Sequence, residues 1–283
     1  MKFTKMHGCG NDYIYINGLE EHVPQEEKPQ MVKYLSDRHF GIGGDGVIFI
    51  NPSEEADFEM EMYNADGSRA EMCGNGIRCV GKYVYDKGMT SQKQISIISY
   101  GKIKYLQLET EEGKVSTVRV NMGAPELSAK NIPVISENEQ VINEEISVSG
   151  QTFKMTCVSM GNPHAVIFVD DVSELDLEKI GPLFENHERF PKRINTEFVQ
   201  IKDRSHVKMR VWERGTGETL ACGTGCCAVA TACILNGLTE EQAVVEVAGG
   251  ELKIEWDREK NLIFMTGTAQ TVFEGEWDGR YTV

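Results

Sequence analysis

Positive charge is scarce in this chain, and so are long apolar runs. The 283 residues include 29 lysines and arginines against 44 aspartates and glutamates, a formal net charge of -15 at pH 7. Such a surface repels phosphate backbones and anionic lipids. No run of about 18 apolar residues occurs, and the start, MKFTKMHGCGNDYIYI, lacks the apolar core of a signal peptide. We therefore expect a soluble, cytoplasmic protein that binds neither nucleic acid nor membrane.

The chain also lacks the cysteine and histidine spacings of a zinc site. Its eight cysteines form no pair of CxxC knuckles, and no HExxH sequence is present. Disulfides seldom persist in the cytosol, so we expect these thiols to be reduced. The spacings predict no metal site, and the cysteines need another explanation.

Most segments alternate apolar and polar residues with a period of two, for example GVIFI, FEMEMY, HVKMRVW and ELKIEW. This pattern is typical of half-buried strands and predicts a sheet that is mostly antiparallel. Four segments indicate helices, at approximately 27–38, 75–86, 177–186 and 226–236. The last segment, CCAVATACILN, is apolar on nearly every side, which favours a helix surrounded by other structure.

The second half of the chain repeats the first. A shift of 149 residues lays MEMYNADGSRAEMCGNG over MRVWERGTGETLACGTG and places Cys73 on Cys222. A shift of 151 residues lays GNDYIYI over GNPHAVIF and places Asn11 on Asn162. The same order of strands and helices follows in both halves. A repeat of this length predicts two similar domains.

These observations predict an α+β fold of two pseudo-symmetric domains. Each domain is expected to be a mostly antiparallel, barrel-like sheet wrapped around a central helix, with the active site in the cleft between the domains. We place the first domain at residues 1–121 and the second at 122–267. The last strand lacks a counterpart in the second half, so residues 268–283 are expected to return and complete the first domain.

One cysteine in each half lies in a Cys-Gly-x-Gly turn that opens a helix. At a helix N-terminus, free N–H groups and the helix dipole favour a thiolate and lower a cysteine pKa from about 8.5 toward neutrality. The same N–H groups provide a site for a carboxylate. Two such half-sites on opposite faces of one carbon would let a thiolate remove a proton while a thiol delivers another. The pair therefore predicts an isomerase that inverts the α-carbon of a small amino acid.

No lysine motif for a pyridoxal cofactor is recognisable, so we expect no cofactor. The protein itself would then have to stabilise the carbanion. N–H groups of two helix N-termini, directed at the α-carboxylate, would act like an oxyanion hole in which each donor contributes about 10²–10³ in rate.

The chain resembles the diaminopimelate epimerases over essentially its whole length, in the motifs KMHGCGNDY, YNADGSRAEMCGNGIRC, GNPHAV, NTEFV and WERGTGETLACGTG. The resemblance implies an epimerase that needs neither pyridoxal nor metal. It implies interconversion of LL- and meso-2,6-diaminoheptanedioate, in lysine and peptidoglycan-precursor biosynthesis, by an enzyme that is usually a homodimer.

The resemblance also implies roles for individual residues. Cys73 and Cys222 would be the base and the acid, exchanging roles with reaction direction, while His164 and Glu213 tune the two thiols. The implied substrate-binding residues are Asn11, Asn64, Gly74, Asn75, Asn162, Asn195, Glu213, Arg214, Gly223 and Thr224. The chain departs from the family pattern at Gly46, where many members have a glutamine that contacts the substrate amine.

Two alternatives stay open at the level of sequence. A proline or hydroxyproline racemase would share the architecture, although those proteins usually read MCGHG where this chain reads MCGNG. A non-enzymatic thiol or metal-binding protein would leave the asparagine, arginine and glutamate pattern unexplained. The cysteines outside the two turns are predicted to be small core hydrophobes, namely Cys79, Cys157, Cys226, Cys227 and Cys233.

Overall fold

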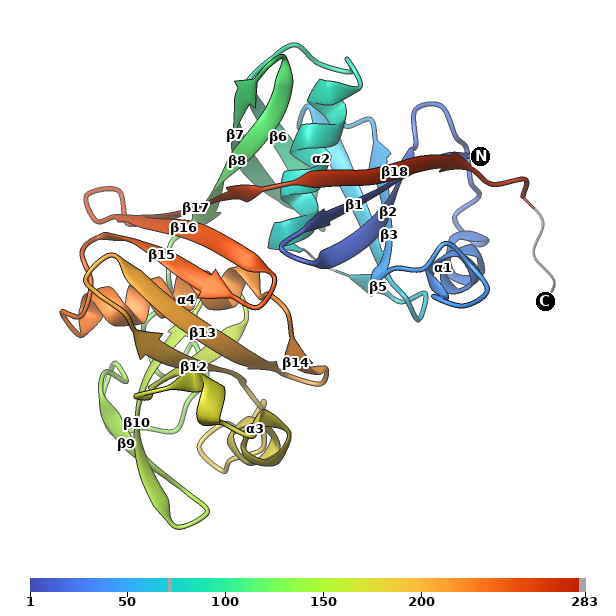
Figure 1. Ribbon diagram of the computed structural model, residues 1–283. Helices are drawn as coiled ribbons and strands as arrows, with labels where there is room; N and C mark the ends of the chain where they lie inside the picture. The colour runs from blue at the N-terminus through green and yellow to red at the C-terminus, as the bar shows by residue number, and fades with distance from the viewer. Residues whose placement is uncertain (71–72, 280–283) are drawn as a thin grey trace. The chain divides into compact units, whose positions relative to one another are not determined.

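The computed structural model describes residues 1–70 and 73–279 (Figure 1). The chain divides into two compact units, which are unit 1, Met1–Val120 with Gly267–Val283, and unit 2, Asn121–Thr266. Both units combine a sheet with a few helices, which confirms the predicted α+β class. Along the described ranges, no helix is both long enough and apolar enough to cross a membrane.

The strands and helices of unit 1 follow the order expected from the alternating sequence. Its strands are β1 (Lys2–Gly8), β2 (Asn11–Asn17), β3 (Gly46–Asn51), β4 (Phe58–Asn64), β5 (Arg69–Ala70), β6 (Gln94–Ser99), β7 (Lys102–Glu111) and β18 (Gln270–Glu276). Its helices are α1 (Lys28–Ser36) and α2 (Gly74–Asp86). The chain passes between the units within β8 (Lys114–Gly123) and β17 (Leu262–Thr268).

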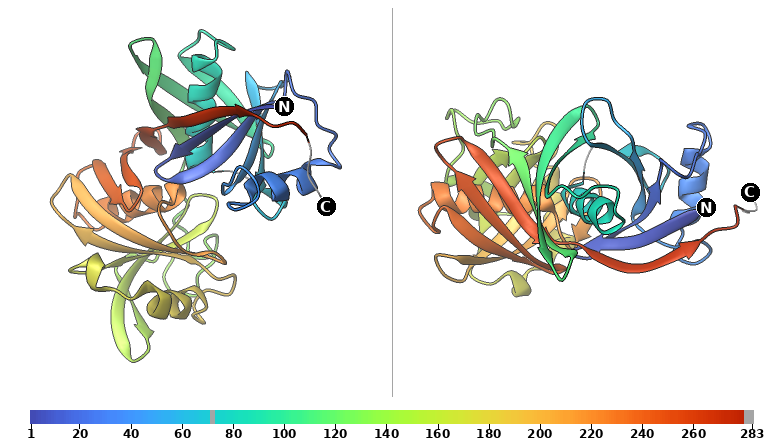
Figure 2. Two further views of the ribbon diagram at one scale, coloured as in Figure 1. Left: turned by 45° about the vertical axis from the view of Figure 1, so that its right-hand side comes forward. Right: turned by 90° about the horizontal axis from the view of Figure 1, so that it is seen from above.

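The sheet of unit 1 curves around α2. Strand β1 pairs with β2 on one side and with β18 on the other, so the last strand of the chain lies beside the first (Figure 1). Helix α2 packs against β1, β2 and β7. Figure 2 shows this helix end-on, within the curve of the strands of unit 1.

Unit 2 repeats this arrangement with its own elements. Its strands are β9 (Glu144–Val148), β10 (Gln151–Ser159), β11 (Pro163–Phe168), β12 (Asn195–Ile201), β13 (His206–Glu213), β14 (Gly217–Thr219), β15 (Gln242–Val247) and β16 (Gly250–Asp257). Its helices are the 3₁₀ turn η1 (Val172–Glu174), α3 (Leu177–Glu185) and α4 (Gly223–Leu235). Helix α4 packs against β10, β11, β12, β15 and β16. Nearly all of its residues are buried, as expected for a helix that is apolar on every side.

Most strand pairs are antiparallel, as predicted, but within residues 1–70 and 73–279 each unit also contains two parallel pairs. These pairs are β2–β3 and β4–β6 in unit 1, and β11–β12 and β13–β15 in unit 2. Parallel neighbours need a long crossover connection, and a helix lies between the two strands of every one of these pairs. Alternation of apolar and polar residues does not distinguish the two directions, so the parallel pairs were not foreseen.

Candidate active site

Each of the two predicted cysteines is the N-cap residue of its helix. Cys73 precedes α2 and Cys222 precedes α4, both with extended backbone conformations. The N–H of Gly76 donates to Cys73 Sγ at 3.3 Å, so this sulfur takes the place that an N-cap oxygen usually occupies. Cys222 holds the same N-cap position, but its side chain makes no cap hydrogen bond. The prediction that both thiols lie at helix N-termini is confirmed.

Glycine at the third residue of each helix leaves room for another side chain against the first turn. A Cβ on Gly76 would lie 2.8 Å from Ile48 Cδ1 and 3.6 Å from the sulfur of Cys73. A Cβ on Gly225 would lie 2.7 Å from Glu197 Oε1 and 3.3 Å from the sulfur of Cys222. The glycines therefore let a neighbouring strand place one side chain beside each sulfur atom.

In unit 1, the structure brings together Cys73, Asn11 and the first turn of α2. Cys73 Sγ donates to Asn11 Oδ1 at 2.9 Å, and Asn11 Nδ2 donates to Asp45 Oδ2 at 2.6 Å. Asn75 is buried, and its Oδ1 accepts a hydrogen bond of 2.9 Å from Nη2 of the fully buried Arg78. Asn11 and Asn75 are therefore held in fixed orientations by partners of their own.

Asn64 lies at the end of β4 and is exposed. Its Nδ2 donates to Ser68 Oγ at 3.1 Å. Asn64 lies opposite Gly46 of the adjacent strand β3, and Gly46 lies opposite Tyr13 of β2. A Cβ at Gly46 would lie 1.9 Å from the carbonyl oxygen of Tyr63, so a glutamine could enter this position only if the backbone moved.

In unit 2, a chain of polar contacts runs through His164. Its Nδ1 lies 2.6 Å from Glu197 Oε1, and its Nε2 lies 3.0 Å from Asn162 Oδ1. Both His164 and Glu197 are completely buried. The contacts fix the imidazole ring at both nitrogen atoms and link the ring to one of the predicted substrate-binding asparagines.

Glu213 lies close enough to the Cys222 thiol to influence it electrostatically, and it accepts a hydrogen bond of 2.6 Å from Thr219 Oγ1. Thr224 Oγ1 lies 3.5 Å from the Cys222 sulfur. Burial raises the pKa of Glu213, and Glu197 raises it further. Of the two predicted residues, Thr224 contacts this thiol and Glu213 acts on it through its charge.

Asn195 and Arg214 are also neighbours. The Asn195 side chain donates to the carbonyl of Pro163 at 2.8 Å and accepts from the backbone N–H of Arg214 at 2.9 Å. The Arg214 guanidinium donates one hydrogen bond, of 3.0 Å, to the carbonyl of Lys192. Asn195 thus anchors the loop that carries Arg214.

The electrostatic surroundings of Cys222 differ from the expectation based on the helix N-terminus alone. Burial raises the pKa of this thiol well above its ordinary value, and the charges of Glu213 and Glu197 raise it further. The Thr224 hydroxyl and the nearby Gly225 N–H lower this pKa by less. The predicted shift toward neutrality is therefore wrong for Cys222, because desolvation and two carboxylates outweigh the helix.

Several side chains around the thiols were not predicted from the sequence, namely Tyr13, Asp45, Arg78 and Glu197. A signal for two of them was present in the repeat. The shift of 151 residues places Tyr13 on His164, and the shift of 149 places Ile48 on Glu197. Arg78 and Asp45 act through asparagines that only the fold brings within reach.

The five cysteines that were predicted to be core hydrophobes are all buried. Cys157 lies in the apolar core of unit 2. Burial raises the pKa of the Cys79 thiol to about 11 and that of Cys233 to about 12. A thiol with such a pKa remains protonated near neutrality.

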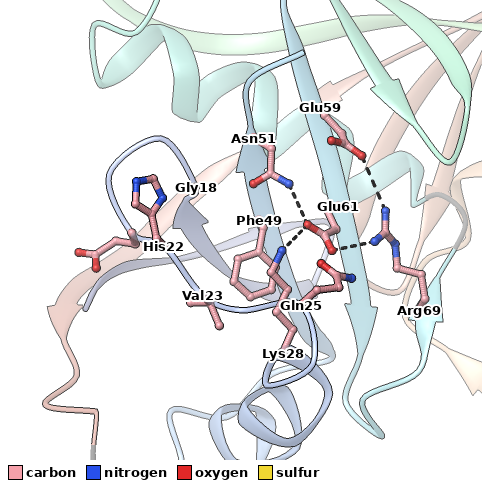
Figure 3. Close-up of a pocket in the computed structure, with 11 residues that line it drawn as sticks. Gly18, His22, Val23, Gln25, Lys28, Phe49, Asn51, Glu59, Glu61 and Arg69 are labelled. Atoms are coloured by element: carbon pink, nitrogen blue, oxygen red, sulfur yellow. Dashed lines mark hydrogen bonds and ion pairs between the residues drawn. The ribbon is translucent and has the colours of Figure 1, made fainter. Parts of the chain in front are cut away.

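A cavity of about 470 Å³ elsewhere in unit 1 contains none of the predicted site residues (Figure 3). Its wall carries Glu61, whose carboxylate accepts hydrogen bonds from Lys28 at 2.6 Å, from Asn51 at 2.8 Å and from Arg69 at 2.7 Å. Both oxygen atoms of the Glu61 carboxylate are hydrogen-bonded to residues of unit 1, which indicates a structural ion-pair cluster.

Comparison with known proteins supplies the family. The chain matches the family described as diaminopimelate epimerase over residues 3–128 and 156–272. Diaminopimelate epimerase of Methanococcus maripaludis (strain C5) is 58% identical over 98% of this chain and 100% of the relative. That of Agathobacter rectalis is also 58% identical, over 98% of this chain and 99% of the relative. The chain belongs to the diaminopimelate epimerase family.

Membership of the diaminopimelate epimerase family confirms the resemblance seen in the sequence and the enzyme class, an isomerase of the epimerase type. Solved structures of lower identity share the fold. A phenazine biosynthesis protein of the PhzF family from Bacillus anthracis superposes with a TM-score of 0.71 at 16% identity, covering 97% of this chain and 98% of that one. A hydroxyproline epimerase from Agrobacterium vitis has a TM-score of 0.67 at 12% identity, covering 97% and 90%.

Proposed function

We propose that this member of the diaminopimelate epimerase family interconverts LL- and meso-2,6-diaminoheptanedioate, with Cys73 and Cys222 as the two proton-transferring groups. The observation that carries the proposal is that each cysteine caps a helix that opens with Gly-x-Gly and contacts residues of the family's binding set. The reaction would serve lysine and peptidoglycan-precursor biosynthesis.

The proton transfer is balanced between the two thiols. One cysteine, as thiolate, takes the α-proton from one face of the carbon, and the C–H electron pair stays on the substrate as a carbanion. The other cysteine, as thiol, delivers its proton to the opposite face and becomes the thiolate. After one turnover the two sulfur atoms have exchanged protonation states, which is the arrangement that the reverse reaction requires. No cofactor or external acid is therefore consumed.

The first turns of α2 and α4 support the carbanion in this proposal. Gly74, Asn75, Gly223 and Thr224 occupy positions whose N–H groups have no partner within the helix. Such groups stabilise the negative charge that develops on the α-carboxylate, as donors in an oxyanion hole do. Asn11 and Asn162, one from each unit, would bind the amino and carboxyl groups of the substrate together with Asn64.

Arg214 and Asn195 favour a dicarboxylic substrate over proline. The Arg214 guanidinium uses one donor on Lys192, which leaves the fork geometry suited to a carboxylate at the far end of the substrate. A monocarboxylic substrate such as proline offers nothing for that group to bind. This is the physical reason to prefer diaminopimelate over the racemase alternative.

Incubation with LL-diaminopimelate in D₂O tests the proposal. We expect deuterium at the α-position of both isomers, read by mass spectrometry, and none in proline supplied under the same conditions. Cys73→Ala or Cys222→Ala should lower the inversion rate by about 10²–10⁴-fold, the usual contribution of a general acid or base. The control Cys157→Ala removes a thiol from the core of unit 2 and should leave inversion near the wild-type rate. Wild-type inversion in either single variant would show that another group moves the proton.

We also propose that the enzyme works in the cytoplasm as a homodimer. A reducing compartment keeps both thiols available for proton transfer. The exposed side chains of Val272 and Phe273 on β18 provide an apolar surface of the kind that subunit interfaces bury. Light scattering at micromolar protein concentration should give twice the 31.7 kDa mass of the chain.

A further inference from the structure

Glu197 is a buried carboxylate, and only one of its two oxygen atoms has a hydrogen-bond partner among the described residues. It lies on β12 with no exposed surface, and its Oε1 accepts a hydrogen bond from His164 Nδ1 at 2.6 Å. Its Oε2 has no hydrogen-bond partner among residues 1–70 and 73–279. A buried oxygen atom without a partner costs free energy of folding. Its retention therefore points to a role that stability alone does not explain.

The equivalent position in unit 1 is apolar. In the parallel pair β2–β3, Tyr13 is paired with Gly46, and in the parallel pair β11–β12, His164 is paired with Asn195. Two residues further along β3 and β12 stand Ile48 and Glu197. The two half-sites thus share their backbone register and differ in these side chains.

The difference extends to a third position and gives the two half-sites different charges. The counterparts Tyr13, Ile48 and Asn64 in unit 1 carry no formal charge. Their equivalents in unit 2 are His164, Glu197 and Glu213. At these three positions, two carboxylates and an imidazole therefore surround Cys222 where unit 1 has uncharged side chains, although both cysteines lie at the N-cap of similar helices.

Glu197 lies against the same turn of α4 as the thiol. Its Oε1 and the Cys222 Sγ lie 2.7 Å and 3.3 Å, respectively, from the point that a Cβ on Gly225 would occupy. The groups that face Cys222 are Glu197 from β12, Glu213 from β13, and Thr224 with the Gly225 N–H from α4, while His164 on β11 lies close enough to Glu213 to influence it. Glu197 is therefore one of two carboxylates whose charge acts on this sulfur.

We infer that Glu197 is a positioning residue for proton transfer at Cys222. Its carboxylate holds the imidazole of His164 and, through this ring, the amide of Asn162. The same carboxylate places a negative charge beside the Cys222 thiol. The inference rests on the proposed function of Cys222. A carboxylate accepts hydrogen bonds but donates none, so the Nδ1 atom that it contacts carries a hydrogen and the ring plane is fixed. The fixed ring places its Nε2 atom 3.0 Å from Asn162 Oδ1.

The variant Glu197→Gln tests the inference, because it keeps the shape of the side chain and removes its charge. The readout is the pH dependence of iodoacetamide labelling, followed separately for Cys222 and Cys73 by peptide mass spectrometry. We expect the labelling midpoint of Cys222 to fall by about one pH unit, and labelling at a fixed pH below the midpoint to be about tenfold faster. The profile of Cys73 should not change. The kcat for inversion should fall about tenfold, by a larger factor than KM changes, since an amide can donate as well as accept and no longer fixes the hydrogen on His164 Nδ1.

Glu61→Gln is the matched control, since Glu61 is also a buried, ion-paired carboxylate but belongs to the cavity wall of unit 1. It should lower the melting temperature and leave both labelling profiles and kcat unchanged. If Glu197→Gln fails to fold, Glu197→Asp replaces it. Aspartate keeps the charge but is one methylene shorter, so the Cys222 midpoint should stay high while kcat falls.

Unchanged labelling of Cys222 in Glu197→Gln, with only a lower melting temperature, would assign Glu197 a structural role and overturn the inference. A wild-type kcat in Glu197→Asp would also overturn the inference. Failure of the proposed function looks different, because Cys222→Ala would then invert diaminopimelate at the wild-type rate. The labelling experiment needs no turnover, so it tests the effect of Glu197 on the thiol in either case.

Discussion

At the scale of single residues, the two cysteines share a backbone position but not an environment. Cys73 is half-buried and donates to a neutral amide, Asn11, whereas Cys222 is buried beside two carboxylates. Burial, Glu213 and Glu197 raise the pKa of Cys222, so this thiol keeps its proton near neutrality. We therefore predict that iodoacetamide at pH 7.5 labels Cys73 at least about tenfold faster than Cys222, because only the thiolate reacts.

The labelled peptides are quantified by mass spectrometry over a time course, with the fully buried Cys79 as the unreactive reference. Diaminopimelate should protect Cys73 from labelling, since the proposed site includes it. Faster labelling of Cys222 than of Cys73 would contradict the assignment of the resting proton to Cys222.

At the scale of secondary-structure elements, the ion pairs of Glu61 fix β4 to its surroundings. Burial alone would raise the pKa of Glu61, but hydrogen bonds from Lys28, Tyr63 and Asn51 lower it to about 2. A carboxylate with a lowered pKa stabilises the fold above its unfolded-state pKa, and this contribution disappears as the pH falls through the folded-state value. We predict that the free energy of unfolding decreases by about 3 kcal/mol between pH 5 and pH 2 through this group.

Urea denaturation at several pH values measures this contribution as the difference between the wild-type protein and Glu61→Gln (Figure 3). The variant should be less stable at pH 7, and the difference should vanish as the pH approaches 2. If the free energy of unfolding depended on pH equally in both proteins, the hydrogen bonds of Glu61 would contribute nothing to stability.

The elements themselves were largely predictable from the sequence, because helix periodicity and strand alternation are local signals. Helix α2 begins one residue before the predicted segment, and α4 begins at Gly223, three residues before its predicted start. The early start at Gly223 places Cys222, with an extended backbone, at the N-cap position that Cys73 has in α2. Glu197 was missed for a different reason. In NTEFVQI it is one polar residue of a strand, and its partner His164 is 33 residues away and reaches it only through parallel pairing.

At the scale of the whole molecule, the two ends of the chain complete the same unit. Strand β18 pairs with β1 from Lys2 opposite Glu276 to His7 opposite Gln270. The N-terminal ammonium donates to the carbonyl of Trp277 at 2.7 Å. The rings of Phe3 and Phe273 meet edge to face, with their centroids 6.0 Å apart. Unit 1 therefore acquires its final strand only after unit 2 has been synthesised.

A chain that ends at Ala269 should therefore lose stability in unit 1 and retain it in unit 2. Loss of β18 removes the ladder beside β1 and uncovers Phe3, which costs at least about 2–3 kcal/mol from apolar burial alone. Hydrogen exchange read by mass spectrometry should show faster exchange in β1 and β2, with the protection of α4 unchanged. A control chain that ends at Gly279 keeps every one of these contacts and should exchange like the full-length protein. Equal protection of β1 in the two truncated chains would mean that the sheet of unit 1 is complete without its last strand, so that the C-terminal segment serves another purpose.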